Sequence, residues 1–320
     1  MTVSRALTGK PEISAKTKQR VLRCAAELGY RPHRWARSLV TRRSSMIGIV
    51  IPDIAHSYFA EITFGIEGVI DPAGYDILLC HSRADVEKEK AEIDMLVGSR
   101  VDGLIIASEQ SEESPGLFDE LKKRGIPFVL IDRFFPKSDF TAVRPDDRAA
   151  GRLATQCLID LGHTRIAHIQ GPSVSTASIR YRGYLDALGA AGMEVNPDWI
   201  VPGDFYLESG REAMKKLLKL SIPPTGVFAA NDPMAIGAIY ACRDAGLRVP
   251  EDISVVGAGN IEGQHHPNPF VTTVDWPREE LGRTAAALLL AAINTRARQP
   301  EVVKVLKPQL LVRQSTAPPA

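Results

Sequence analysis

The stretch "MIGIVIPDI" (Met46–Ile54) decides the fold, because an apolar run closed by a proline is typical of a strand buried on both faces. Similar runs follow along the chain. They are "YDILLC" (75–80), "VDGLIIAS" (101–108), "PFVLID" (127–132), "IAHIQG" (166–171), "GVFAAN" (226–231) and "ISVVGA" (253–258). Strands of this kind occur in parallel sheets that helices cover on both sides. The sequence therefore predicts an α/β fold.

Amphipathic segments fit between these strands. They span residues 58–72, 86–99, 114–124, 147–161, 178–191, 208–220 and 232–245. Strands that alternate with helices form parallel βαβ units. The stretch "TAVRPDDRAAG" (141–151) restarts the pattern, so we divide this part of the chain into two similar lobes. Ligands of such sheets bind at the carboxyl ends of the strands, which places the expected ligand in the cleft between the lobes.

The composition is that of an ordinary soluble protein, with 320 residues, 44% of them hydrophobic and 24% charged. No stretch approaches the roughly 18 uncharged apolar residues of a membrane span, and no signal peptide opens the chain. We therefore expect a cytoplasmic protein with no membrane partner. The cysteines Cys24, Cys80, Cys157 and Cys242 lie far apart without a C-x-x-C pair, and we interpret them as buried reduced thiols.

Positive charge is concentrated at the N-terminus. The first 45 residues hold eleven Lys or Arg and two Glu, a net charge of +9 in a chain whose total is +1. The segment "PEISAKTKQRVLRCAAELGYRP" (11–32) predicts a helix capped by Ser14 with an apolar stripe through Val21, Leu22, Ala25 and Leu28. A short basic helical module favours nucleic acid as the partner.

The opening "MTVSRALTGK" (1–10) has the pattern of a chain that begins in the middle of a helix. Val3 and Leu7 share one helical face and Gly9 with Pro11 ends the helix, yet only two residues precede Val3. We expect the true start to lie upstream, the alternative being a truncated form. The basic stretch "HRWARSLVTRRSS" (33–45) is interpreted as a linker, or as a helix formed only on binding.

Several motifs resemble the lactose/galactose repressor family nearly end to end. They are "TVSRAL" (2–7), "KPEISAKTKQRVLRCAAELGYRP" (10–32), "WARSLVTRRSSMIGIVIPDI" (35–54), "GYLDALGAAG" (183–192), "VFAANDPMAIGA" (227–238) and "GLRVPEDISVVGAGN" (246–260). The resemblance implies a two-lobed core like that of periplasmic binding proteins, with two doubly wound parallel sheets, preceded by a small all-α partial DNA-binding headpiece. We assign the partial helix-turn-helix and hinge helix to 1–44 and the effector-binding core to 45–320. Lobe one takes about 45–146 and 277–302, and lobe two about 147–276 and 303–320.

The resemblance also implies which headpiece residues contact DNA. In the family "TVSRAL" belongs to the recognition helix, so Thr2, Ser4 and Arg5 are expected to bind phosphate or a guanine edge. The helix and turn that precede it in the family are absent here. Ser14 and Thr17 are candidates for phosphate contacts, and pure helix capping is an equal alternative for Ser14.

Further DNA contacts are implied in the hinge. Tyr30 and His33 resemble backbone-contacting positions, although Tyr30 could equally pack the third helix. The stretch "ARSL" (36–39) matches the hinge helix, in which Leu39 would insert between base pairs in the minor groove. Arg37 would supply charge for the phosphates.

Candidate effector residues follow strand ends. Tyr58 and Phe59 open a helix where aromatic rings can line a cleft, with core packing an even alternative for Phe59. The stretch "TASIRYRGY" (176–184) places Thr176 and Arg180 early in a helix, and Arg180 matches the arginine that anchors the effector in the family. Phe205 matches an aromatic residue that stacks on the effector.

The cleft departs from the family after "VVG". Many members have an aromatic residue and an aspartate there, whereas this chain has Ala258, Gly259 and Asn260. The lost carboxylate, with Arg180 retained and Arg133 adding positive charge, favours an acidic or differently shaped ligand. Asn231 and Asp232 follow another strand, and Asp232 could instead cap the next helix.

Other functions are less well supported. No Gly-rich phosphate loop and no G-x-S-x-G motif is present, so we expect neither an enzyme nor a cofactor. The pair His265 and His266 is interpreted as exposed rather than as a metal site. Asp146 and Asp147 are interpreted as caps of the following helix rather than as ligand contacts. A solute-binding protein would need export and would have no use for a basic hinge.

The sequence thus predicts a DNA-binding transcription regulator, a repressor, whose operator affinity is switched by a small effector, a sugar or sugar acid. The partners are operator DNA, this carbohydrate-type effector and further copies of the chain in a homodimer or tetramer. The alternative is an effector sensor that does not bind DNA because its headpiece is incomplete.

Replacing Leu39 by Ala tests the hinge assignment. A leucine wedge costs a few kcal/mol of base unstacking and is compensated by contacts that only the bent operator makes. Leu39→Ala is therefore expected to weaken operator binding far more than binding to random DNA in parallel titrations. Equal losses on the two DNAs would contradict the wedge.

Overall fold

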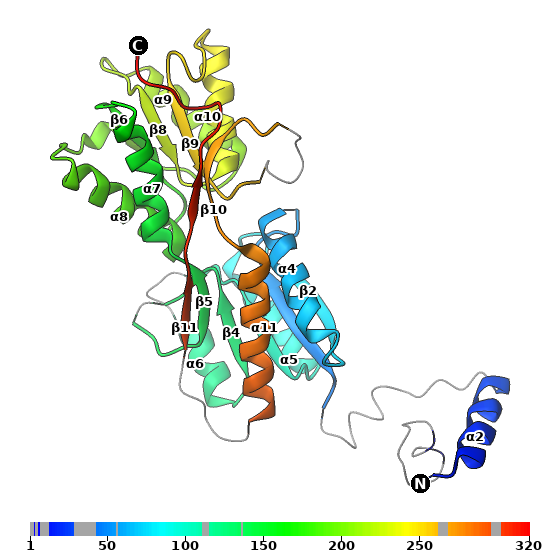
Figure 1. The fold of residues 1–320 in the computed structure, drawn as a ribbon. Coiled ribbons are helices and arrows are strands. Elements are labelled where there is room, and N and C mark those ends of the chain that lie inside the picture. Colours follow the sequence, from blue (N-terminus) through cyan, green and yellow to red (C-terminus); the bar gives the residue numbers. More distant parts are fainter. Residues whose placement is uncertain are drawn as a thin grey trace.

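A computed structural model describes residues 3, 6, 13–28, 43–55, 57–110, 115–135, 137–261, 268–295 and 302–320. Two six-stranded sheets form two lobes, with helices on both faces of each sheet (Figure 1). The predicted two-lobed α/β core is confirmed. Most of the apolar runs became strands because they are buried from both sides, as the unbroken burial of β3 and β6 illustrates. The run "YDILLC" instead forms the edge strand β2, whose residues are half-buried or exposed.

The first lobe is built on a parallel sheet in the order β11-β5-β4-β3-β1-β2. Its strands are β1 (Met46–Ile51), β2 (Asp76–His81), β3 (Gly103–Ile106), β4 (Phe128–Ile131), β5 (Ala142–Pro145) and β11 (Val303–Leu306). Its helices are α4 (Ser57–Ile70), α5 (Val86–Gly98), α6 (Gly116–Lys123) and α11 (Arg278–Asn294). The pleat of β1 separates the two cores, because Ile49 packs in one cluster with Ile66 and Val50 in another with Ile93.

The second lobe repeats this plan in the order β12-β10-β9-β8-β6-β7, with β12 antiparallel to β10. Its strands are β6 (Ile166–Ile169), β7 (Ile200–Val201), β8 (Gly226–Ala229), β9 (Ser254–Ala258), β10 (Thr272–Asp275) and β12 (Gln309–Leu311). Its helices are α7 (Asp147–Asp160), α8 (Ser175–Ala190), α9 (Leu207–Leu218) and α10 (Asp232–Asp244), with the short 3-10 helix η1 (Pro197–Trp199).

The chain passes between the lobes at three places. These lie between β5 and α7, between β10 and α11, and between β11 and β12. We expected residues from 303 onward to belong to lobe two, but β11 pairs with β5 of the first sheet, so the last crossing falls at residues 307 and 308. In Figure 1 the red C-terminal strands run along both lobes across this crossing.

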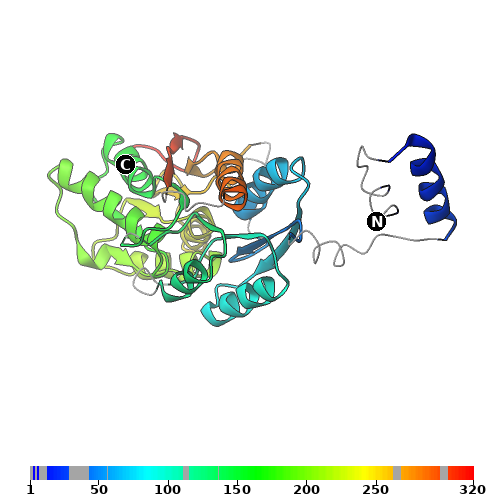
Figure 2. The same cartoon turned by 90° about the horizontal axis from the view of Figure 1, so that it is seen from below.

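Close helix contacts hold each lobe together, and each uses one glycine from either helix. Gly65 and Gly282 lie where α4 crosses α11, and a methyl group on either would overlap a backbone carbonyl of the partner helix. The same holds for Gly151 and Gly183 between α7 and α8, and for Gly210 and Gly237 between α9 and α10. Figures 1 and 2 both show α11 beside α4, although more than 200 residues separate them in sequence.

The longest described segment of the headpiece is the helix α2 (Ala15–Glu27) with its cap. The Ser14 hydroxyl accepts a hydrogen bond from the Thr17 amide at 3.3 Å and lies 2.9 Å from the Thr17 hydroxyl, so the predicted cap is confirmed. The helix buries none of its side chains. Leu22 and Cys24 are consequently exposed, and for Cys24 the prediction of a buried thiol is wrong.

Several predicted DNA-contacting residues lie outside the described residues. They are Thr2, Ser4, Arg5, Tyr30, His33, Arg37 and Leu39, and the pair His265 and His266 lies outside them as well. Among the residues that the structure does describe, no helix is long and apolar enough to cross a membrane.

A matched pair of glycines in α8 tests the helix crossing. Gly183→Ala places a methyl group against the Arg148 carbonyl of α7, and such overpacking typically costs about 1–3 kcal/mol. Gly189→Ala, in the same helix, meets nothing within 4 Å and is expected to be neutral or to stabilise by up to about 1 kcal/mol. Urea unfolding of both variants measures the difference, and equal stabilities would contradict the close crossing.

Candidate functional site

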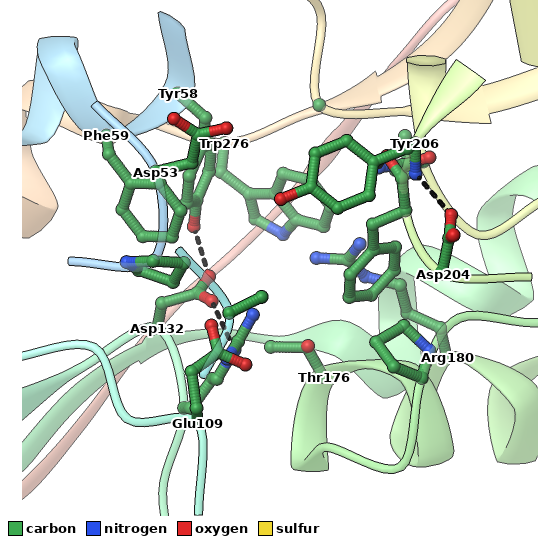
Figure 3. Close-up of a pocket in the computed structure, with 18 residues that line it drawn as sticks. Asp53, Tyr58, Phe59, Glu109, Asp132, Thr176, Arg180, Asp204, Tyr206 and Trp276 are labelled. Atoms are coloured by element: carbon green, nitrogen blue, oxygen red, sulfur yellow. Dashed lines mark hydrogen bonds and ion pairs between the residues drawn. The ribbon is translucent and has the colours of Figure 1, made fainter. Parts of the chain in front are cut away.

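A cavity lies between the lobes at the carboxyl ends of the strands, as expected for this topology (Figure 3). Together with the solvent at its open side it holds about 700 Å³. The lining residues are Pro52, Asp53, Tyr58, Phe59, Ala84, Glu109, Asp132, Arg133, Pro172, Thr176, Arg180, Asp204, Phe205, Tyr206, Asn231, Ala258, Gly259 and Trp276.

Most of the predicted effector residues meet in this cavity. Those that line it are Tyr58, Phe59, Arg133, Thr176, Arg180, Phe205 and Asn231. The other two lie behind its wall. The Asp232 carboxylate accepts hydrogen bonds from the Thr273 hydroxyl at 2.6 Å and the Ile261 amide at 2.9 Å, and Asn260 binds the guanidinium of Arg313.

The helix α10 is capped by Asn231 and not by Asp232. The Asn231 side-chain oxygen accepts a hydrogen bond from the Met234 amide at 3.1 Å. Its amide nitrogen donates to the Phe205 carbonyl at 2.8 Å and so fixes the loop before α9. Asn231 therefore positions Phe205, which has a φ of 75° in this loop.

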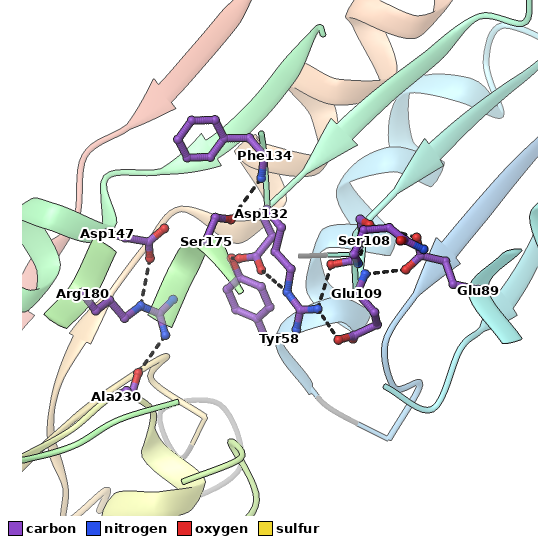
Figure 4. Close-up of polar contacts among 12 residues, drawn as sticks. Tyr58, Glu89, Ser108, Glu109, Asp132, Phe134, Asp147, Ser175, Arg180 and Ala230 are labelled. Atoms are coloured by element: carbon purple, nitrogen blue, oxygen red, sulfur yellow. Dashed lines mark hydrogen bonds and ion pairs between the residues drawn. The ribbon is translucent and has the colours of Figure 1, made fainter. Parts of the chain in front are cut away.

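Arg180 is held rigidly at the floor of the cavity (Figure 4). Its Nε donates to Asp147 at 2.8 Å, and its Nη1 donates to the Ala230 carbonyl at 2.8 Å. The guanidinium carbon lies 4.6 Å from the centre of the Trp276 ring. No hydrogen bond joins its remaining nitrogen, Nη2, to the residues described around it, which leaves that donor for a ligand.

Asp147 supports Arg180 and does not cap a helix. The prediction of two caps holds for Asp146, which accepts a hydrogen bond from the Ala149 amide at 3.0 Å, but is wrong for Asp147. The Asp147 side chain is 1% exposed and pairs with Arg180. Burial raises the pKa of Asp147 to about 7, and the nearby Arg180 opposes this shift.

A chain of polar contacts lines the side of the cavity that belongs to the first lobe (Figure 4). The Tyr58 hydroxyl donates to Asp132 at 2.5 Å, and burial together with this carboxylate raises the pKa of Tyr58 well above its usual value. The Arg133 guanidinium lies 2.6 Å from Glu109 and donates to the Ser108 carbonyl at 2.8 Å. The buried Glu89 in turn accepts the hydrogen bond of the Glu109 amide.

These contacts reverse the expected charge of the cavity. Arg133 was predicted to make the lining positive, but Glu109 and Asp132 neutralise it. Among the described residues of the lining, Asp53, Glu109, Asp132 and Asp204 contribute four carboxylates, against the two guanidinium groups of Arg133 and Arg180. The described part of the lining is therefore net negative.

The sequence reasoning missed several lining residues, notably Asp53, Glu109, Asp132, Asp204, Tyr206 and Trp276. Asp53, Glu109 and Asp132 come within a few residues of the ends of β1, β3 and β4, which is the signal that could have found them. Figure 3 shows Asp53, Glu109 and Asp132 on the side of the first lobe and Asp204 and Tyr206 across from them.

Some buried polar atoms of the lining have no hydrogen-bond partner within the described part of the chain. The indole Nε1 of Trp276 is an unpaired donor on a side chain that is only 2% exposed, and Oε1 of Glu109 is an unpaired acceptor. Buried polar groups are normally hydrogen-bonded, so these two atoms are candidates for ligand contacts. No group of three or more metal-ligating side chains occurs within the described ranges.

Comparison with known proteins agrees with this geometry. Residues 44–312 match the periplasmic binding proteins and sugar binding domain of the LacI family, and residues 1–33 match the bacterial regulatory proteins of the lacI family. The transcriptional repressor PurR of Pasteurella multocida is 37% identical over 317 residues, which cover 98% of this chain and 94% of that protein.

Two solved structures share the fold over nearly the whole chain. The lac repressor dimer bound to operator and the anti-inducer ONPF superposes with a TM-score of 0.87 at 30% identity, over 99% of this chain and 94% of that one. The regulator CelR in complex with cellobiose superposes with a TM-score of 0.77 at 34% identity, over 98% and 94%. These relatives are transcription regulators, which confirms the prediction of a DNA-binding regulator rather than an enzyme. The chain belongs to the lacI family of bacterial regulatory proteins.

Proposed function

We propose that this regulator is a cytoplasmic, homodimeric repressor whose effector is a neutral carbohydrate bound in the cleft between the lobes. The observation that carries the proposal is an unsatisfied donor and an unsatisfied acceptor in a cavity whose described lining is net negative. Sugar hydroxyls both accept and donate, so different hydroxyls of one sugar can accept from Trp276 Nε1 and donate to Glu109 Oε1. A carboxylate ligand would meet four carboxylates for two guanidinium groups.

Aromatic rings support the same ligand class. Tyr58, Phe59, Phe205, Tyr206 and Trp276 all line the cavity, and apolar ring faces with a few placed polar groups are typical of small-molecule sites. The related regulator CelR binds cellobiose. A neutral saccharide uses both the rings and the hydrogen-bonding atoms of this cavity.

The geometry also supports a switch that depends on the lobes. The effector site takes Tyr58 and Glu109 from the first lobe and Arg180 and Tyr206 from the second. A ligand that contacts both lobes favours one relative arrangement over another, and only this difference in affinity can shift the equilibrium. In a homodimer the two headpieces would read a pseudo-palindromic operator.

The charge of the ligand provides the first test. Cellobiose and other neutral saccharides are compared with their uronic acids by isothermal titration. We expect a neutral sugar to bind and its acid to bind at least about tenfold more weakly. A repulsion of about 1.4 kcal/mol between the acid and the cavity is enough for this tenfold difference. Tighter binding of the acid would contradict the proposal.

Trp276→Phe tests the unpaired donor. The phenyl ring keeps an aromatic face near Arg180 but lacks Nε1, and one lost hydrogen bond costs about 1 kcal/mol, which weakens effector binding roughly fivefold. Trp199→Phe is the matched control, because Trp199 donates to the Ile222 carbonyl outside the cavity and is expected to leave affinity unchanged. Identical affinities for the two variants would remove Trp276 from the site.

DNA binding is tested by salt. A double-stranded oligonucleotide selected from a random pool by the chain serves as the operator, and its affinity is measured between about 50 and 200 mM salt. With several phosphates neutralised, log K is expected to fall linearly with log salt at about −0.9 per phosphate. A chain that selects no DNA would contradict the repressor.

A further inference from the structure

The segment that joins the N-terminal module to the core is fastened where it enters β1. The Asp102 carboxylate accepts a hydrogen bond from the Ser44 amide through Oδ1 at 2.9 Å and another from the Ser45 amide through Oδ2 at 2.9 Å. The Ser44 hydroxyl also donates to Oδ1 at 3.2 Å. One carboxylate thus holds two consecutive backbone amides.

This arrangement fixes an unusual backbone conformation. Ser45 has a φ of 56°, in the left-handed region that residues with a side chain rarely adopt. Backbone hydrogen bonds secure both sides of it, because the Asp76 amide donates to the Ser45 carbonyl at 2.9 Å and the Asp102 amide donates to the Met46 carbonyl at 2.8 Å. The direction in which the chain leaves the core is therefore set by Asp102 and its neighbours.

A second contact extends the anchor toward the N-terminus. The Arg43 guanidinium donates to the side-chain oxygen of Asn294 at 3.1 Å. Asn294 is the last residue of α11, the helix that follows the second crossing between the lobes. Residues 43–45 are thus attached both to the sheet of the first lobe and to α11, the helix that begins at the second crossing between the lobes.

The anchor and the effector site lie at opposite ends of the same strands. Ser45 precedes β1 and Asp53 follows it, while Asp102 precedes β3 and Glu109 follows it. The six residues of β1 span about 20 Å at roughly 3.3 Å per residue. Because both strands are buried and paired with each other, they move as one body.

We infer that Asp102 is a positioning residue for DNA binding, which fastens the DNA-binding segment to the first lobe so that a rotation of that lobe reorients the segment. The inference rests on the proposed function, since it concerns how the effector site controls that same DNA binding. Without the carboxylate the exit direction of the chain is no longer fixed, and operator affinity falls while the effector site is untouched.

The test compares Asp102→Asn with Asp94→Asn. The asparagine keeps the shape of Asp102 but replaces one acceptor oxygen with an amide, so one of the two backbone amides loses its partner. Asp94 is an exposed aspartate on α5 of the same lobe and provides the matched control. Each chain is examined by hydrogen exchange at Ser44 and Ser45, by operator titration with and without the effector, and by effector titration.

For Asp102→Asn we expect exchange at Ser44 and Ser45 to be at least about tenfold faster and operator affinity about tenfold lower. The ratio of operator affinities with and without effector should shrink toward one. Effector affinity should stay within about twofold of the unaltered chain, which a general loss of structure would not allow. Asp94→Asn should match the unaltered chain throughout.

Asn294→Ala gives a second and milder variant, because it removes one hydrogen-bond acceptor of Arg43 at the end of α11 and leaves Asp102 in place. We expect a twofold to threefold loss of operator affinity. The inference is overturned if both variants bind the selected operator with the affinity of the unaltered chain and lose or gain that affinity with effector to the same extent. The proposed function stands in that case. If the unaltered chain selects no DNA, the proposed function fails and the inference fails with it.

Discussion

The buried ion pair between Arg180 and Asp147 connects the first crossing between the lobes with the wall of the cavity. Asp147 opens α7 directly after the first crossing between the lobes, and Arg180 lies where α8 passes so close to α7 that Gly151 cannot carry a side chain. Burial disfavours such a pair, and it raises the pKa of Asp147 to about 7 despite Arg180. Burying the two charges costs desolvation energy, and removing one partner would leave the other as an uncompensated buried charge. The pair therefore fixes the orientation of the Arg180 side chain rather than adding to the stability of the fold.

The first lobe treats its charges differently from the second. In the first lobe, Glu109 and Asp132 neutralise the charge of Arg133. In the second lobe, Nη2 of Arg180 remains available to a ligand, because only Nε and Nη1 donate hydrogen bonds to the described residues. The two lobes therefore offer complementary chemistry to the cleft. Carboxylate acceptors come mainly from the first lobe and the available guanidinium donor comes from the second, which makes a ligand with both donors and acceptors a bridge between them.

The sequence predicted the long elements and the general place of the site for a physical reason. Strands buried on both faces leave unbroken apolar runs, but β7 has two residues and β11 is exposed along most of its length, so neither leaves a pattern. Arg180 and Phe205 were found through family motifs. Glu109 was missed because only the packing of β3 against β4 brings it to Arg133, a contact 24 residues apart in the chain.

How an effector in the cleft between the lobes alters DNA binding depends on which parts of the molecule can move. The sheets are close-packed, with Ile49 and Ile105 fully buried on neighbouring strands, and such interiors transmit displacement instead of absorbing it. A ligand at Asp53 and Glu109 therefore cannot act on Ser45 by bending β1. In the switch that we propose, the change occurs at the three crossings, where Trp276 and Arg278 are buried and Arg278 donates to the Gly259 carbonyl at 2.7 Å. Rotation about these crossings moves the first lobe as a unit, and residues 43–45 move with it.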